Sequence, residues 1–476
     1  MKLTPPPVGR RPKTLEECYE ALDHDAAVQE QLCTAVEKLA KQVTHLEEKL
    51  RTNSQNSSKP PSSDPNRPKV PPRKDKRKRK RGGQKGRKGT QRKLVPVDQV
   101  DELHEVYLTG SCACGGEMEH METEPRRHQV FELPKVKPLI TEYRLHKAAC
   151  DCCGRVNEAS LPEGVPAGML GPRAMSTIGV MGSSFRLSRR LIKSFLKEFF
   201  SLDISLGLIS KVEKKLTKAL EPYYEAIRQH VLMAKIVNMD ETTHYQCNKS
   251  GYMWLAVTQA ASFFAARLTR SGDVAREILG EKSLAILGSD RYSGYAWFDA
   301  ARRQICWAHL FRDLTKIQQR DESGFVGDAL AKWAADVFEL WGKFRDGKLQ
   351  RKSLIRKSKF AREQFEGWLE WAAKANHEKT AGTCAKLMEV KAGLWTFLFI
   401  EGVDPTNNVA ERTIRSYVIK RKLSFGSQSE RGDRFLESIY SVMSTCKQQD
   451  LNIMTVLTDA VRAMLCGTPP PPLLSA

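Results

Sequence analysis

The sequence lacks the features of an exported or membrane-embedded chain. Near the N-terminus, Pro5–Pro7 interrupts the chain before the apolar segment of a signal peptide could form. The most apolar run, residues 253–268, is broken by Thr258, Gln259 and Ser262 and is too polar to span a bilayer. Most of the twelve cysteines are scattered singly, so a disulfide framework is not indicated either. We therefore expect a cytoplasmic chain with no membrane partner.

Acidic residues are in the minority. The 476 residues contain 77 Lys and Arg against 56 Asp and Glu, a formal net charge of +21. Residues 67–93 alone hold fifteen Lys or Arg and one Asp, a net charge of +14. Such a block stays extended and attracts polyanions by releasing their counterions. It predicts contact with nucleic acid, centred on Arg77, Lys78, Arg79, Lys80 and Arg81, although a localisation signal or a solvated tail has the same composition.

The length predicts several domains, and a hydrophobic content of 41% is sufficient for ordinary cores. We place an N-terminal helix at residues 1–52, where apolar residues follow the a/d spacing of a coiled coil: Leu32, Val36, Leu39, Val43, Leu46 and Leu50. This spacing favours a short dimerising helix, or an amphipathic helix docked on its own protein. Residues 53–93 follow as a disordered Ser/Pro-rich linker and basic tail.

Residues 94–160 resemble a small zinc-ribbon-like module. Two cysteine pairs, each followed by glycine, flank the strand-forming stretches 130–133 and 139–143. The second pair has the usual two-residue gap of a zinc knuckle, whereas the first has a gap of one residue. The sequence predicts structural zinc rather than free thiols, with these ligands: Cys112, Cys114, Cys150 and Cys153.

Residues 161–230 are expected to form a helical domain. The helical pattern from Leu187 to Leu216 is interrupted at residues 202–205, and Ser205 is a suitable N-cap for a second helix. This arrangement is compatible with a DNA-binding helix-turn-helix, and equally with an ordinary pair of packed helices.

From Lys235 the pattern becomes strand-like. Strands are expected at 235–240, 251–258, 262–268, 284–289 and 303–306, with a helix at 273–279 and another from Trp307. Three strands, a helix, a strand, a helix and a strand is the order of a ribonuclease-H-like α/β core, in which the first and fourth strands are neighbours. We divide the remainder into a first part of this core, a helical insertion, a second part with C-terminal helices, and a tail: 231–319, 320–403, 404–466 and 467–476.

Three carboxylates stand out in this core. Asp240 and Asp290 end two of the short apolar strands, and Glu411 lies on a late helix for which Thr406 or Asn407 is a suitable cap. Together they can hold a pair of divalent ions that clamp the attacking and leaving oxygens of a phosphodiester. Taken singly, each aspartate is more simply a strand-end cap, and Glu411 forms a surface ion pair with Arg415. The metal site is favoured because the two aspartates occur together, at matching strand ends.

The insertion is expected to be helical with an aromatic core. It carries five tryptophans on helical patterns, and burial of all five in one core is the simplest expectation: Trp333, Trp341, Trp368, Trp371 and Trp395.

Seven motifs occur together in one order. They are residues 56–64 (NSSKPPSSD), the paired cysteine knuckles, 239–242 (MDET), 289–295 (SDRYSGY), 306–309 (CWAH), 407–412 (NNVAER) and 425–427 (FGS). With them the chain resembles the DDE transposases of the insertion sequence 66 family over nearly its whole length. Arg291, in the loop after Asp290, departs from the small or neutral residue expected there.

The resemblance implies a DNA transposase of a bacterial insertion sequence, associated with the nucleoid. It implies that Asp240, Asp290 and Glu411 bind two Mg²⁺ or Mn²⁺ ions, and that Cys306 and His309 lie near the site in an unassigned role. Partners would be double-stranded DNA, as transposon ends and target, a second copy of the chain, and small accessory proteins of the element. Expected DNA phosphate contacts beyond the basic tail are Arg412, Arg415, Arg421 and Lys422. A nuclease that cuts without joining, or a non-catalytic DNA-binding descendant of a transposase, remains open.

Overall fold

The computed structural model describes residues 14–52, 56–57, 93–118, 123–424 and 426–474. The chain divides into two compact units, which are described separately. The larger comprises Tyr143–Lys193 and Ile204–Ala476 with the N-terminal segment Met1–Arg67, and the smaller comprises Pro68–Glu142 and Ser194–Asp203. The basic cluster Arg77 to Arg81 lies outside the described residues. Among the residues that are described, no helix is both long and apolar enough to cross a membrane.

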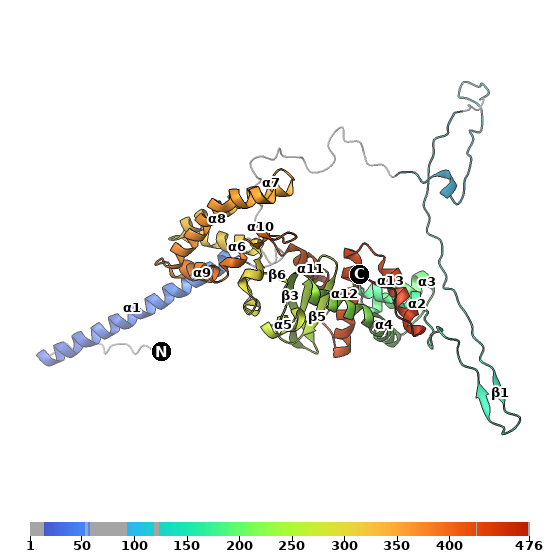
Figure 1. Cartoon of the computed structure of the whole chain (residues 1–476), viewed down its shortest axis with the longest axis horizontal. Helices are drawn as coiled ribbons and strands as arrows, with labels where there is room; N and C mark the ends of the chain where they lie inside the picture. Colours follow the sequence, from blue (N-terminus) through green and yellow to red (C-terminus); the bar gives the residue numbers. More distant parts are fainter. Residues whose placement is uncertain (1–13, 53–55, 58–92, 119–122, 425, 475–476) are drawn as a thin grey trace. The chain divides into compact units, whose positions relative to one another are not determined.

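The N-terminal helix forms as predicted and is longer than its apolar seam. Helix α1 runs without interruption over Leu15–Arg51 (Figure 1, blue). The seam residues are exposed to solvent, for example Leu39 at 59% and Leu46 at 57%. The helix therefore presents an apolar stripe that the described residues of this chain leave exposed.

The predicted β-rich module contains less strand than expected. Two short strands, β1 (Lys147–Ala149) and β2 (Val156–Glu158), pair antiparallel around the second cysteine pair. The stretches 130–133 and 139–143 are not strands, so that prediction is wrong. Their apolar side chains are solvent-exposed, Val130 at 80% and Leu139 at 95%. Strand pairing needs a buried face to be stable, and these segments have none.

Three helices precede the sheet: α2 (Pro172–Ser183), α3 (Arg189–Phe200) and α4 (Leu206–Met233). The predicted cap is confirmed, because Ser205 Oγ accepts a hydrogen bond from the Leu208 N–H at 3.1 Å. The apolar side of α4 packs against two C-terminal helices, α12 (Glu430–Gln448) and α13 (Ile453–Leu465). Much of α4 therefore belongs to the core of the larger unit.

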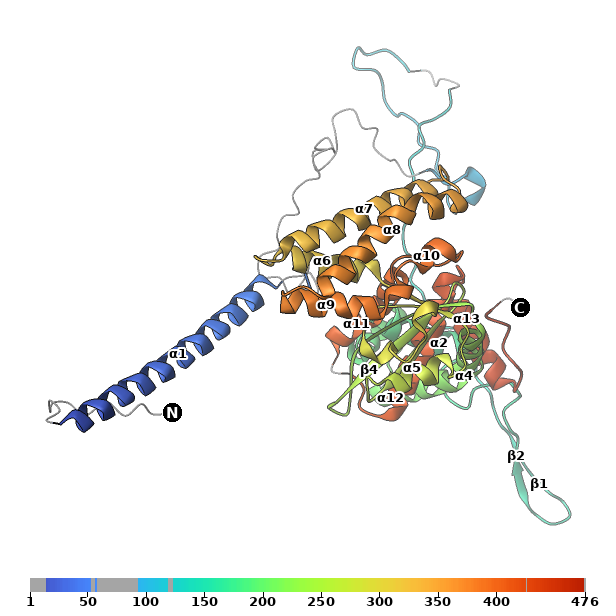
Figure 2. The same cartoon turned by 60° about the vertical axis from the view of Figure 1, so that its left-hand side comes forward.

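A five-stranded mixed sheet forms the centre of the larger unit (Figures 1 and 2). Its spatial order is β5-β4-β3-β6-β7, with β4 antiparallel to both of its neighbours, β5 and β3, and with β6 and β7 parallel to β3. The strands span Ile236–Gln246 (β3), Lys249–Val257 (β4), Ser262–Arg267 (β5), Ile286–Ser289 (β6) and Arg303–Ile305 (β7). Helix α5 (Gly272–Leu279) connects β5 to β6. The first and fourth strands lie side by side, as the sequence predicts.

Strand β3 continues six residues beyond Asp240, so the prediction that Asp240 ends its strand is wrong. It joins β4 through a two-residue turn at Cys247 and Asn248, both with positive φ (48° and 63°). That geometry matches the twist of a tight hairpin. The apolar pattern stops at Met239 because the second half of β3 is polar, yet pairing with β4 keeps it extended.

The connection from β6 to β7 contains two short 3₁₀ turns, η3 (Ser293–Tyr295) and η4 (Ala300–Arg302), where the ribonuclease-H-like order has an α-helix. The helix predicted from Trp307 follows β7 and is confirmed. Tyr295 is fully buried and meets Trp254 edge-on at 6.1 Å. This aromatic contact holds the connection against the sheet in place of a helix.

Helix α12 covers the outer edge of the sheet. Three of its side chains, four residues apart, accept hydrogen bonds from alternate N–H groups of the edge strand β5. Thr445 pairs with Ser262, Ser441 with Phe264 and Glu437 with Ala266, at 2.8 to 3.1 Å. The edge is therefore satisfied by a helix, which prevents pairing with another strand.

The insertion is helical, as predicted, and α7 and α8 form a long adjacent pair (Figures 1 and 2). Helix α6 (Trp307–Gln318) leads into it from β7, and its own helices are α7 (Gly324–Arg345), α8 (Arg351–Ala373), α9 (Glu378–Glu389) and α10 (Thr396–Phe399), with the turn η5 (Lys391–Gly393). Trp341 and Trp395 are buried in one core with Trp307. Trp371 is 51% exposed and packs on Phe325 at the surface, so a five-tryptophan core is wrong in this respect. Helix α11 (Asn408–Leu423) follows and packs on β3 and β4.

Candidate active site

The sheet register places Asp240 and Asp290 at the same level of neighbouring strands. The last paired residues of β3 and β6 are Asn238 and Gly288. Each aspartate lies two residues beyond its member of this pair. Parallel strands advance equally per residue, so the two carboxyl groups leave the sheet side by side.

Asp240 lies in a strongly acidic environment. Burial raises the pKa of Asp240 well above its usual range, and the nearby charges of Glu241, Asp290 and Glu411 raise it further. One Asp240 oxygen accepts the Glu241 backbone N–H at 2.9 Å, and Asp290 Oδ1 accepts the Tyr292 N–H at the same distance. A buried carboxylate repelled by three others is stabilised by a bound cation.

A buried arginine supports the Asp290 loop from behind. The Arg303 guanidinium donates to the Asp290 carbonyl oxygen at 2.9 Å and to Ser289 Oγ at 3.1 Å. Burial lowers the pKa of Arg303, while the charge of Asp290 raises it. Arg291, the residue that departs from expectation, forms an ion pair with Asp313 on α6.

Asn407 anchors the start of α11 to the first aspartate strand. Its side chain does not cap the helix, so that suggestion from the sequence is wrong. Instead its Nδ2 donates to the Met239 carbonyl oxygen at 2.7 Å, next to Asp240, and its backbone N–H donates to Cys306 Sγ at 3.2 Å. Asn407 is 4% exposed. This residue fixes the position of Glu411, one turn further along the helix.

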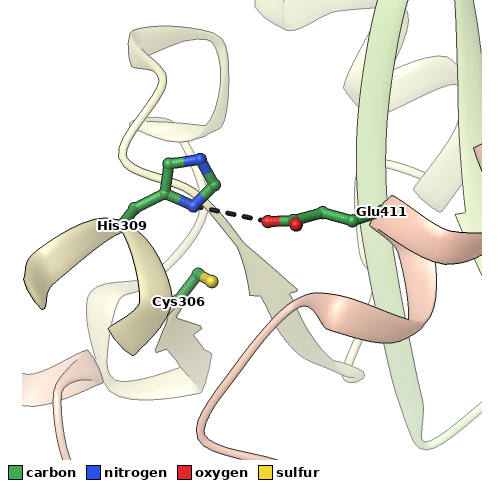
Figure 3. A group of neighbouring side chains, drawn as sticks. All are labelled: Cys306, His309 and Glu411. Carbon is green, nitrogen blue, oxygen red and sulfur yellow. Dashed lines mark ion pairs between the residues drawn. The ribbon is translucent and has the colours of Figure 1, made fainter. Parts of the chain in front are cut away.

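Glu411 faces His309 and Cys306 across a narrow gap (Figure 3). Its Oε1 lies 3.6 Å from His309 Nδ1, so the expected surface pair with Arg415 is replaced by a contact inside the site. The ligand atoms of Cys306, His309 and Glu411 all lie within 4.8 Å of one another. Burial raises the pKa of the Cys306 thiol, and the backbone N–H groups of Asn407 and His309 lower it.

Glu241 is held on the other face of β3. Its carboxylate accepts the Tyr295 hydroxyl at 2.6 Å and forms an ion pair with Arg270. Burial raises the pKa of Glu241, and the Tyr295 hydroxyl lowers it. Because both ends of the carboxylate are engaged, Glu241 is a structural neighbour of Asp240 and a poor substitute for it as a metal ligand.

A buried polar network, missed by the sequence, also joins α11 to β3. His244 hydrogen bonds to the Tyr417 hydroxyl at 2.5 Å through Nδ1 and to Asp433 at 2.7 Å through Nε2. Ser427 donates to the same Asp433 carboxylate. Gly426, with φ +81°, lets this segment approach β3, where the Ser427 N–H donates to the Tyr245 carbonyl oxygen at 2.9 Å. The motif at residues 426 and 427 is thus part of a positioning network.

The candidate DNA contacts on α11 differ in exposure. Arg412, Arg415 and Lys422 are exposed at spacings of three and seven residues, which places them along one side of the helix. Arg421 is half-buried and donates to the Thr243 carbonyl oxygen at 3.1 Å. The exposed three are available to phosphates, whereas Arg421 also braces the helix against β3.

Each cysteine pair adopts a tight turn that ends at a left-handed glycine. The turns close through hydrogen bonds from the Gly115 N–H to the Cys112 carbonyl oxygen (2.7 Å) and from the Gly154 N–H to the Cys150 carbonyl oxygen (2.8 Å). The Gly116 N–H lowers the pKa of Cys114, and the Cys153 N–H lowers that of Cys150. Backbone donors directed at sulfur favour the thiolate that binds zinc. The two pairs belong to different units and are described separately.

The sequence profile described as "Transposase IS66 family" matches residues 168–434, which include all three carboxylates. The chain belongs to this transposase family. Residues 109–154 match the zinc-finger binding domain of transposase IS66, which supports structural zinc, and residues 6–93 match a family of unknown function.

Two relatives from Sinorhizobium fredii are uncharacterised proteins. The one called y4hP is 24% identical over 418 residues, 79% of this chain and 74% of its own length. The one called y4qI is 25% identical over 210 residues, 41% of this chain and 38% of its own length. Neither name states an activity, so the residue roles in this IS66 transposase depend on its own geometry.

Proposed function

We propose that this IS66 transposase cuts and joins DNA through Asp240, Asp290 and Glu411, acting on two divalent ions in a ribonuclease-H-like core. The single observation that carries the proposal is the register of β3 and β6, which brings Asp240 level with Asp290. The strand order β5-β4-β3-β6-β7, in which only β4 runs against the other strands, supports the ribonuclease-H-like assignment.

The residues present fit a pair of hard divalent ions. Carboxylate oxygens are the ligands that Mg²⁺ and Mn²⁺ prefer. Burial and the charge of Glu241 raise the pKa of Asp240, and the charges of the two other proposed ligands, Asp290 and Glu411, raise it further. When bound, such ions activate an attacking water or 3′-hydroxyl and stabilise the departing oxygen. Asp240 would be the ligand shared by the two ions, and Asp290 and Glu411 would each hold one.

The remaining residues position the DNA and the acids. Asn407 and the network of His244 and Tyr417 hold α11, and with it Glu411, against β3. The exposed Arg412 and Arg415 on the same helix contact phosphates of the bound strand. The exposed apolar stripe of α1 supports a homo-oligomer, in which a coiled coil brings two transposon ends together.

A strand-transfer assay tests the proposal. Labelled DNA carrying the ends of the element is incubated with the protein, Mg²⁺ and a target plasmid, and products are scored as joined, cut or only bound. We expect joined product from the native chain. Cut ends alone would indicate the nuclease alternative, and binding alone the non-catalytic one.

Substitution of Asp240 by Asn gives the decisive comparison. Loss of a ligand to a Lewis acid that contributes several kcal/mol should reduce cutting and joining by at least about 10³-fold. DNA affinity should be nearly unchanged. The matched control is Asp273→Asn, because Asp273 is 81% exposed and pairs with Arg276 on its own helix. An Asp240→Asn protein that still joined ends would remove Asp240 from the site.

A further inference from the structure

Cys306 and His309 lie at the N-terminus of helix α6. Cys306 occupies the N-cap position directly after β7, and the His309 N–H donates to its carbonyl oxygen at 3.1 Å. Residues three apart at a helix start lie on the same face. The neighbouring Trp307 N–H donates to the Pro405 carbonyl oxygen at 2.9 Å, which fixes the N-terminus of α6 against the segment that leads into α11.

Two buried polar atoms between the N-terminus of α6 and helix α11 have no hydrogen-bond partner within the part of the chain that the structure describes. They are His309 Nδ1 and Glu411 Oε1, and they point toward each other at 3.6 Å (Figure 3). This separation is too long for a hydrogen bond. Two ligand atoms bound at about 2.1 Å to one tetrahedral ion lie roughly 3.4 Å apart. The gap therefore has the width of a shared metal ion.

The third donor at the gap is the sulfur of Cys306, a residue that is 1% exposed and whose Sγ already accepts the Asn407 N–H. N–H···S bonds of this kind orient and stabilise a metal-bound thiolate. Sulfur and imidazole nitrogen select borderline transition-metal ions such as Zn²⁺ and Co²⁺, whereas Mg²⁺ and Ca²⁺ prefer oxygen alone. This donor set differs in kind from the all-carboxylate set of Asp240 and Asp290.

We propose that Cys306, His309 and Glu411 form a site for one zinc-class ion, with a fourth position open to water. The Cys306 thiol loses its proton to solvent when the ion binds. The proposal rests on this geometry and not on DNA cleavage. It also gives Glu411 two roles, because the same carboxylate lies in the acidic group around Asp240, and an ion held by His309 and Cys306 would fix its orientation there.

Cobalt spectroscopy on the full chain tests the site. The background protein carries Cys→Ser at residues 112, 114, 150, 152 and 153, so that the zinc-finger cysteines cannot bind the probe. Titration with Co²⁺ should produce a sulfur-to-cobalt charge-transfer band and visible bands of tetrahedral intensity at one equivalent. Zn²⁺ should displace the probe and abolish the spectrum, whereas Mg²⁺ should not.

Two substitutions in this background assign the ligands. Cys306→Ser should remove the charge-transfer band, and His309→Gln should retain it with at least about tenfold weaker affinity. The matched controls Cys384→Ser and Cys446→Ser, at buried cysteines elsewhere, should leave the spectrum unchanged. His309 is partly exposed, so its substitution keeps the test valid if Cys306→Ser fails to fold.

The proposal is overturned if the background protein shows no charge-transfer band, if the band persists in Cys306→Ser, or if His309→Gln binds Co²⁺ as tightly as the background. The result is separable from the proposed catalytic function. Asp240→Asn should abolish DNA cleavage and leave the sulfur-to-cobalt band in place, and a missing band with normal cleavage would remove the zinc-class site alone.

Discussion

Asn407 connects three parts of the site, so its substitution offers a sharp test of how the site is positioned. Its amide donates to the Met239 carbonyl oxygen at 2.7 Å, and its backbone N–H donates to Cys306 Sγ. Asn407→Ala leaves the buried Met239 carbonyl without this donor. Leaving one buried polar group unpaired costs about 1–3 kcal/mol. The start of α11 is then free to shift, and a displacement of about 1 Å at a catalytic group can reduce the rate about 10²-fold.

Two measurements on the same protein check this prediction. Urea unfolding followed by tryptophan fluorescence should show a lower midpoint for Asn407→Ala, because Trp307 reports on the core next to this contact. Mn²⁺ titration should show weaker binding although no proposed ligand has been removed. Asn407→Asp keeps the shape but replaces the donor by an oxygen facing the Met239 carbonyl, so it should be at least as destabilising.

The neighbouring Asn408 provides the matched control. It has the same side chain, lies at the first residue of the same helix, and is exposed. Asn408→Ala should change the unfolding midpoint and Mn²⁺ affinity little. Equal effects of the two substitutions would refute the view that Asn407 holds α11 against the aspartate strand.

Three further predictions concern the backbone, the acidic site and the basic tail. Gly426→Ala should lower the unfolding midpoint strongly, because φ is +81° and the added Cβ would lie 2.1 Å from the Tyr245 carbonyl oxygen. The control Gly342→Ala, in open space on α7, should be neutral or stabilising. Equal midpoints for the two variants would contradict the close approach of Gly426 to β3. The raised pKa of Asp240 means that the folded state binds the Asp240 proton more tightly than the unfolded state does. Without metal, the free energy of unfolding should therefore fall as the pH rises from the ordinary Asp pKa toward the raised one. Asp240→Asn should flatten this fall in unfolding curves recorded in the presence of a chelator. Deletion of residues 67–93 should reduce the dependence of DNA affinity on salt in a fluorescence binding assay, and an unchanged slope would place the phosphate contacts elsewhere.

Local patterns were sufficient to predict the elements that carry the acids. The apolar run before Asp240 and the run before Asp290 each mark a strand, because a buried strand needs continuous apolar residues. The strand order then follows from the sequence of elements, and it brings the two aspartates together. The second half of β3 was missed because its residues are polar and stay extended only through pairing with β4.

The contacts that position Glu411 leave no local signal. Asn407 bonds to a carbonyl 168 residues away, and Asp433 meets His244 across 189 residues. No periodicity links such pairs, so the sequence indicates Asn407 only as a helix cap and does not predict the His244 network. One signal was available in retrospect: His244 is four residues from Asp240 and therefore on the same face of the strand.

The most direct test of the account is a crystal structure of the protein soaked in Mn²⁺, with the ions located by anomalous scattering. The account predicts one peak within about 2.2 Å of carboxylate oxygens of both Asp240 and Asp290, and a second that contacts Asp240 and Glu411. Peaks elsewhere, or carboxylates that stay too far apart to share an ion, would contradict the claim that these three residues form a metal-dependent DNA transfer site.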